Sequence, residues 1–171
     1  METLTKTAVL LLTTTHKPSD PQFDFFLCHT VSSAYALRTI LPVLPAKHHT
    51  RLIRSHWLFT LFVYLTQMRP SIKPELLEEV NATDKGWGHV QNFALKNTET
   101  HFMKGSSYLF GHQYGCLADE CGDIALRVMR DSAKLYKADE SFYLRAALKF
   151  GDEFRGWVGF ENSKNTIDIK A

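Results

Sequence analysis

Apolar residues recur at helical spacing along most of the chain, which predicts an all-α fold. Residues 23–41 and 48–67 are apolar on nearly every side, as buried helices are. Pro70 and Pro74 follow the second of these, and Pro74 then takes the first position of a short amphipathic helix. Because the joints are short, we predict a compact multi-helix domain with antiparallel neighbours. Further helices are expected at 87–96, 99–114, 119–136 and 140–150.

The two ends of the chain lack this periodicity. Residues 1–22 are rich in Thr and contain two prolines, and only residues 8–12 form an apolar run. We expect an irregular N-terminal arm or linker there, with at most a short strand, followed by a single helical domain at 23–171. From Gly151 onward, glycines are interspersed with aromatic residues, which predicts an irregular or hairpin-like C-terminal tail.

The helices at 23–41 and 48–67 are more apolar than expected for a chain of 171 residues, because most helices of a small domain have one solvated side. Two explanations stay open. Either both helices lie at the centre and are covered by the others, or they pack against something else. That partner would be a second copy of the chain, forming a homodimer, or a missing N-terminal half.

Composition narrows the class of protein. Hydrophobic residues make up 44% and charged residues 22%, as in ordinary globular domains. The formal net charge of +2 is too small for a protein that binds nucleic acid mainly through electrostatics. Three cysteines cannot form a fully paired secreted framework, so a reducing compartment is expected. No targeting signal is recognisable, which predicts a cytoplasmic location. The most apolar stretch, 57–65, is far shorter than the roughly 20 residues of a membrane span, so no membrane partner is expected.

Candidate chemistry lies on the helix expected at 99–114. At 100° per residue, His101, Lys104, Tyr108 and His112 fall on one stripe. Two imidazoles, an amine and a phenol on one face are typical of a metal or catalytic site in a helical core. A solvated polar face is the simpler alternative, because exposed His and Lys need no partner.

Three further features bear on metal and cofactor binding. His29 lies in a run of apolar residues and is expected to be buried, so its imidazole must hydrogen-bond, bind metal or stay neutral. A zinc site from His112, Cys116 and Cys121 is a weaker hypothesis, because the two cysteines lack the close spacing of structural zinc sites. No Gly-rich phosphate loop is present, so a nicotinamide cofactor would bind without its usual sequence marks.

Several ordered segments resemble the questin oxidase-like family. Residues 24–33 contain His29, and His101-Phe-Met-Lys104 resembles the family's His-x-x-Lys element. The resemblance extends over roughly residues 23–160. Its other segments are Leu41-Pro-Val-Leu-Pro, Arg51-Leu-Ile-Arg, 57–70, Phe142-Tyr-Leu-Arg-Ala-Ala and Gly156-Trp-Val-Gly-Phe160.

The resemblance implies an oxygen-using oxidoreductase with a largely helical fold. Members of this group, which are fungal and bacterial proteins, are associated with opening the rings of anthraquinones and similar aromatic polyketides. The reaction implied is Baeyer–Villiger-type cleavage supported by NADPH, or dioxygenative cleavage at non-haem Fe(II). In the second case His29 and His101 would be imidazole ligands, and a carboxylated Lys104 would add an oxygen ligand. His112 lies on the same helix stripe as His101 and Lys104 but is not part of the resemblance.

Length leaves two functional hypotheses. Members of the family are typically more than twice as long, and the portion without a counterpart here is their N-terminal half. The chain is therefore either an oxygenase or a non-catalytic truncated homologue that serves as a helical interaction module. Convergence of His29 with His101 and Lys104 would favour the first hypothesis, and exposed apolar helix faces would favour the second.

Overall fold

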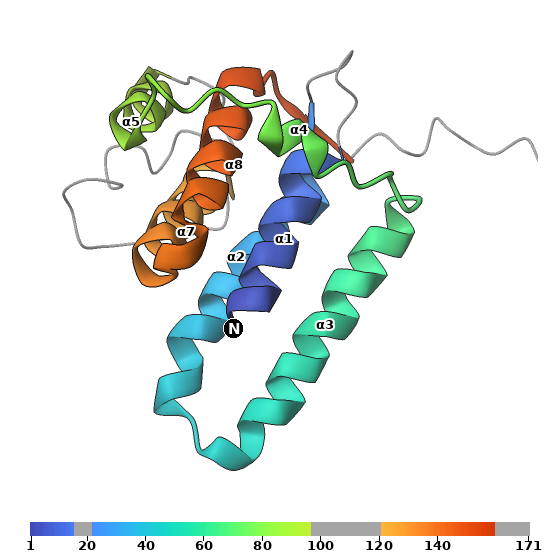
Figure 1. Cartoon of the computed structure of the whole chain (residues 1–171). Coiled ribbons are helices and arrows are strands. Elements are labelled where there is room, and N and C mark those ends of the chain that lie inside the picture. Colours follow the sequence, from blue (N-terminus) through green and yellow to red (C-terminus); the bar gives the residue numbers. More distant parts are fainter. Residues whose placement is uncertain (16–21, 97–120, 160–171) are drawn as a thin grey trace, which may run out of the picture.

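The computed structural model describes residues 1–15, 22–96 and 121–159. Within them the protein is mostly helical, which confirms the all-α prediction, and one pair of two-residue strands forms the only sheet. The α-helices are α1 (Glu2–Thr14), α2 (Phe25–Ile40), α3 (His49–Thr66), α4 (Glu75–Glu78), α5 (Trp87–Lys96), α7 (Cys121–Leu135) and α8 (Glu140–Glu153) (Figure 1). The strands are β1 (Phe23–Asp24) and β2 (Trp157–Val158), and short 3-10 turns occur at Leu41–Val43, Ala46–His48 and Lys137–Asp139.

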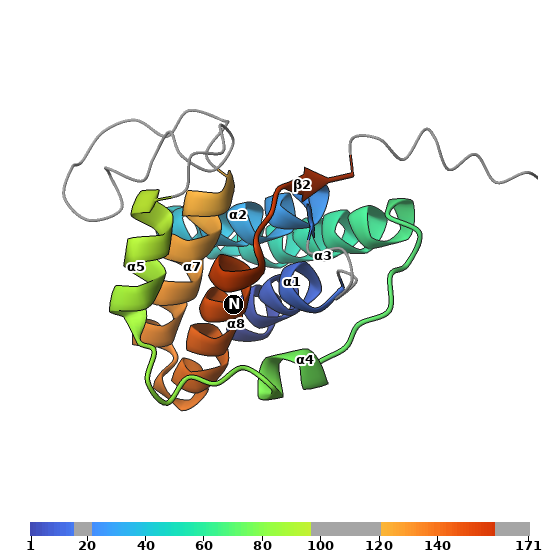
Figure 2. The ribbon, with the colours of Figure 1, turned by 90° about the horizontal axis from the view of Figure 1, so that it is seen from above.

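Helix α2 lies at the centre of the bundle. Helices α1, α3 and α7 all pack against it, and α8 packs against α7 and α1 (Figures 1 and 2). Leu27, Val31 and Ala34 of α2 recur every three to four residues and are completely buried. One of the two strongly apolar helices is thus covered by its neighbours.

The irregular arm expected at residues 1–22 is wrong for most of that segment. Residues 2–14 form α1, in which Val9 and Leu12 are buried in the core. The threonine-rich end fits a helix because the Thr13 hydroxyl donates to the Val9 carbonyl at 2.8 Å, and the two following threonines make the same bond one turn back. Helix α1 is therefore part of the domain, and the short strand considered there is absent.

Residues 151–159, the described part of the C-terminal tail, do not form a hairpin. Helix α8 continues to Glu153, and β2 then pairs in parallel with β1, which lies more than a hundred residues earlier. The backbone N–H of Phe23 also donates to the Gly156 carbonyl at 3.1 Å. The tail is thus tied to the start of α2.

Helix α3, the second strongly apolar helix, lies at the edge of the molecule (Figure 1). It packs chiefly against α2 and the turn before it, and its buried residues are His56, Thr60 and Val63. Large apolar side chains elsewhere on its circumference are exposed. None of the described helices is both long and apolar enough to cross a membrane. The two apolar helices therefore have different surroundings, although their sequence patterns are alike.

Candidate functional site

The position of His29 follows from the start of α2. The Asp24 side chain caps this helix, because its Oδ1 accepts a hydrogen bond from the backbone N–H of Leu27 at 3.0 Å. Burial raises the pKa of the Asp24 carboxyl, and the backbone N–H groups of Leu27 and Phe26 oppose that rise. With the first turn fixed, Leu27 and Cys28 are buried and His29 is half-buried beside them. The expectation that His29 is buried is therefore confirmed only in part.

Aromatic rings lie next to His29 at the start of α2. The Phe25 ring meets the His29 imidazole edge-on, with centroids 4.6 Å apart, and its centroid lies 5.6 Å from that of Trp157. Trp157 reaches this place because β2 pairs with β1. Gly159 lets the tail pass close to α2: its φ is +108°, and a Cβ there would lie 3.0 Å from the Phe26 ring. His29 thus lies at the border of an apolar region walled by aromatic rings.

The described residues do not by themselves complete a metal centre. Among them, no three His, Cys, Asp or Glu side chains are grouped closely enough to hold an ion. His29 is the one predicted ligand in this part of the chain. His101, Lys104 and His112 lie outside the described residues, so their distances to His29 stay a prediction. The zinc hypothesis stays a prediction too, because none of its three ligand side chains is described.

His56 is a buried histidine on α3. Its Nε2 lies 3.1 Å from the Ser33 hydroxyl and 3.3 Å from the Thr30 carbonyl on α2, and its Nδ1 lies 3.3 Å from the Thr60 hydroxyl. A neutral ring with the proton on Nε2 satisfies all three contacts, since the Thr60 hydroxyl can then donate to Nδ1. Burial lowers the pKa of His56, and the Thr30 contact opposes that change. His56 therefore joins α3 to α2 as a neutral, structural group.

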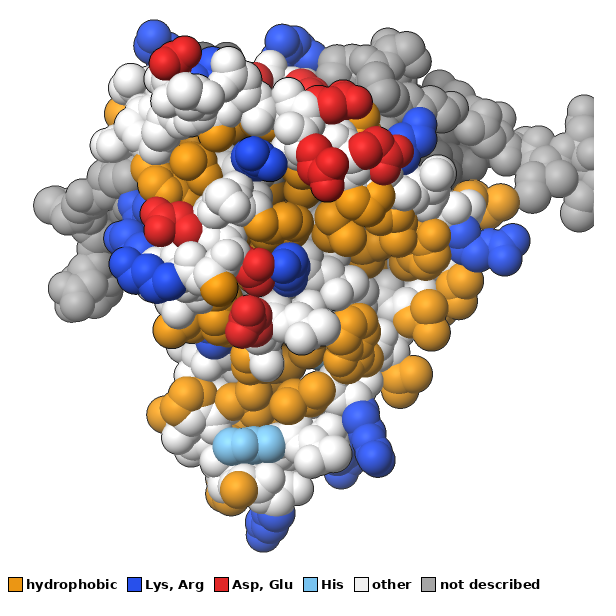
Figure 3. All heavy atoms as spheres, viewed as in Figure 1, with side chains coloured by type: hydrophobic (Ala, Val, Ile, Leu, Met, Phe, Trp, Pro, Cys, Tyr) orange, Lys and Arg blue, Asp and Glu red, His pale blue; other side chains and the backbone are white. Residues whose placement is uncertain are grey.

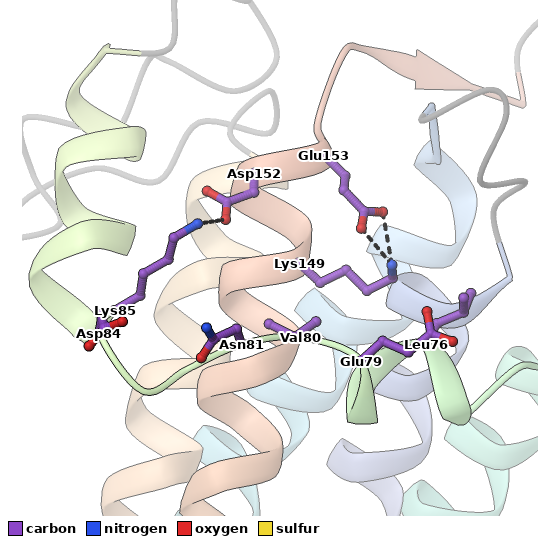
Figure 4. A pocket seen from close by; sticks show the side chains of 9 residues that line it. All are labelled: Leu76, Glu79, Val80, Asn81, Asp84, Lys85, Lys149, Asp152 and Glu153. Carbon is purple, nitrogen blue, oxygen red and sulfur yellow. Dashed lines mark hydrogen bonds and ion pairs between the residues drawn. The ribbon is translucent and has the colours of Figure 1, made fainter.

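A polar cleft of about 460 Å³ lies between α8 and the segment that connects α4 to α5 (Figure 4). At its rim the Asp152 carboxylate accepts from Lys85 Nζ at 2.5 Å and from His89 Nε2 at 2.7 Å. Within it, the nearly buried Lys149 amine donates to both carboxylate oxygens of Glu153, at 2.7 and 2.9 Å.

Asp152 and Glu153 of the cleft are both paired with basic side chains. Burial alone would raise the pKa of Asp152, but its bonds to Lys85 and His89 hold the pKa below the ordinary value. The bonds of Asp152 to Lys85 and His89 join α5 and the residues just before it to the end of α8. We therefore interpret these three side chains as structural. No spacing signal could have revealed the pairing of Asp152, because its partners Lys85 and His89 lie more than sixty residues away in the sequence.

The protein is an all-α helical bundle in which His29 contacts one ring of an aromatic cluster, that of Phe25. Residues 1–106 match the sequence model described as questin oxidase-like, and the chain belongs to this family. The match includes His29, His101 and Lys104 but not His112. It begins at the first residue, in agreement with the packing of α1, and ends before the later segments of the resemblance noted over 23–160. No curated protein and no solved structure matches the chain significantly.

Proposed function

We propose that this chain is an oxidoreductase that cleaves a ring of an aromatic polyketide, such as an anthraquinone, with molecular oxygen. The observation that carries the proposal is the family match, because it includes His29, His101 and Lys104. The place of His29 supports it, since the half-buried imidazole lies beside Phe25, whose ring in turn packs against Trp157. Planar aromatic substrates stack favourably against such rings, and apolar surroundings exclude water.

The proposal assigns Fe(II) to His29, His101 and Lys104, with Lys104 carboxylated. Imidazole nitrogens together with a hard oxygen ligand suit non-haem Fe(II), which would supply the binding of O₂. The described residues contribute His29 alone to this set, so the assignment depends on where the other two side chains lie.

NADPH is the reductant in one of two forms of the reaction. In Baeyer–Villiger-type cleavage, one oxygen atom enters the ring beside a carbonyl carbon, and the other is reduced to water by the two electrons of NADPH. In dioxygenative cleavage, both oxygen atoms enter the product and NADPH is not consumed. The ratio of NADPH to O₂ consumed therefore distinguishes the two forms.

Bound iron tests the metal assignment separately from activity. The chain is purified anaerobically, supplied with Fe(II) and analysed for metal, beside His29→Ala and His101→Ala. His89→Ala is the matched control, because His89 is exposed on α5 and bonded to Asp152. We expect about one iron per chain in the wild type and in the control, and loss of iron in the other two variants. Iron that survives both substitutions contradicts the assignment.

Oxygen consumption with an anthraquinone substrate tests the reaction. Equal consumption of NADPH and O₂ would support the Baeyer–Villiger form, and O₂ uptake without NADPH would support the dioxygenative form. If the folded chain consumes neither, it is not an oxygenase. The alternative, a non-catalytic interaction module, is favoured by one specific observation, the exposed apolar face of α3.

A further inference from the structure

The side of α3 that points away from α2 is apolar over about three turns. Leu58 and Phe62 are 67% and 66% exposed, and Met68, just beyond the helix, is 66% exposed. At about 200 Å² per large side chain, roughly 700 Å² of apolar surface is left uncovered, counting the three further residues named below. The largest apolar patch of a typical monomer is about 300–600 Å². The same face includes Trp57, Leu61 and Leu65, which are 39–52% exposed.

The charges of the segment that carries this apolar face are of one sign. Between Asp24 and Glu75 the sequence holds six basic residues and no acidic one, whereas the rest of the chain has four more acidic than basic residues. Arg51 and Arg54 are exposed on the first turns of α3, and their helical phase places them on the same side as the apolar residues. Arg69 is exposed just past the other end of the helix. Apolar side chains line this edge of the molecule in Figure 3, with basic side chains towards both of its ends.

The fold itself holds this face outward. His56, on the opposite side of α3, is bonded to Ser33 and Thr30 of α2, and Val63 is buried on the same side. These buried polar contacts oppose rotation of the helix about its own axis, since turning it would break the bonds between His56 and α2. The apolar face is therefore a constant feature of the folded chain.

Charge decides what covers the face. In a twofold antiparallel pair of α3 helices centred on the apolar stretch, Arg54 of one copy would lie opposite Arg69 of the other. The two arginines would repel each other, because this segment has no acidic residue that could pair with either of them. An anionic lipid surface meets both requirements, because lipid phosphates pair with arginines while Trp, Phe and Leu side chains enter the acyl boundary. We propose that the exposed face of α3 docks the protein onto an anionic membrane surface, with the helix lying in the plane of the interface.

This docking differs from a membrane span. The expectation of no membrane partner rested on the length needed to cross a bilayer, and the described helices indeed include none that could do so. A helix that lies at the interface needs only a wide apolar face bordered by basic residues. The proposal does not depend on the oxidation reaction.

Vesicle flotation with the full chain tests the proposal. The protein is mixed with vesicles of phosphatidylcholine alone, or of phosphatidylcholine with one third phosphatidylglycerol, and is floated on a density gradient so that aggregates stay at the bottom. We expect flotation with the anionic vesicles and much less with the neutral ones. The bound fraction should fall at high salt, because screening weakens the attraction between arginines and phosphates.

Two double variants separate the apolar from the basic contribution. Leu58→Ser with Phe62→Ser should weaken vesicle binding at least tenfold, and Arg51→Gln with Arg54→Gln about 25-fold, at roughly fivefold for each basic residue near the surface. The matched controls, Leu95→Ser on α5 and Lys134→Gln on α7, replace exposed residues elsewhere and should bind like the wild type. All four substituted positions on α3 are exposed, so unchanged thermal unfolding will show that the fold is intact.

Three outcomes would overturn the proposal. The first is no flotation with anionic vesicles, and the second is equal flotation with both kinds of vesicle. The third is a dimer, seen by light scattering, that strengthens with salt and is lost in the Leu58→Ser, Phe62→Ser variant. That result would assign the face to a second copy of the chain, since salt screens the repulsion between two basic segments.

Discussion

Leu12 tests whether α1 belongs to the folded domain. Its side chain is 1% exposed within the core that α1 shares with α2 and α8. Leu12→Ala removes buried atoms and leaves a cavity that neighbouring side chains fill only in part. At fully buried positions this substitution lowers the free energy of unfolding by about 3 kcal/mol, within a range of about 2–5. For a chain of this size each kcal/mol lowers Tm by roughly 2–4 °C, so we expect Tm to fall by roughly 6–12 °C.

The assay is thermal and urea unfolding, followed by the helical circular dichroism signal. The control is Leu95→Ala on α5, which makes the same chemical change at a side chain that is 51% exposed. Its effect should stay within about 0.5 kcal/mol. If Leu12→Ala unfolds at the same midpoint as Leu95→Ala, α1 does not pack in the core and residues 1–22 are an arm after all.

Three further substitutions test the contacts described above. Burial lowers the pKa of His56 below 6.5, so the unfolded chain binds a proton at a higher pH than the folded one. The free energy of unfolding should therefore fall as the pH drops below about 6.5. Urea unfolding between about pH 8 and 5 should show that this free energy depends less on pH in His56→Gln than in the wild type. Lys85 and His89 lower the pKa of Asp152, so its contribution to the free energy of unfolding is present above about pH 4 and is lost as the pH falls further. Because these ion pairs are exposed, Asp152→Asn should lower the free energy of unfolding by at most about 1 kcal/mol at pH 7, and not at all at pH 2. Gly159→Ala should lower the free energy of unfolding by about 1–3 kcal/mol, since φ is +108° and the added Cβ would press on a ring of α2; a neutral effect would show that the tail is not held there.

Most helices could be located from the sequence because their signals are local. Apolar periodicity and the flanking prolines place α2 and α3 within two residues of the observed ends, and α5 at its observed ends. Helix α1 escaped this reasoning because threonine favours strands and its hydroxyl competes for the backbone. In the structure those hydroxyls bond within the helix, and burial of Val9 and Leu12 outweighs the weak propensity. The pairing of β1 with β2 likewise joins segments that are distant in the sequence, so no local sequence pattern predicted it.

The candidate site also has features that local sequence predicts and features that depend on distant contacts. The helix that carries His29 could be predicted, but its half-burial depends on the Asp24 cap and on a tail that arrives from the other end of the chain. His56 carried no spacing signal, since its partners Ser33 and Thr30 lie on another helix. Residues whose function depends on contacts between distant segments are those that the sequence alone leaves undetermined.

The different surroundings of α2 and α3 show what apolar pattern alone can decide. Both helices have apolar residues on nearly every side, yet α2 is enclosed by α1, α3 and α7 while α3 has one main neighbour. Burial alone would favour turning the Trp57 and Phe62 side of α3 inward, because that side is the more apolar one. The His56 contacts oppose that rotation, since it would break the bonds between His56 and α2 and bury an arginine. A buried polar network that holds an apolar face towards the outside is best explained by a surface that the face has to meet.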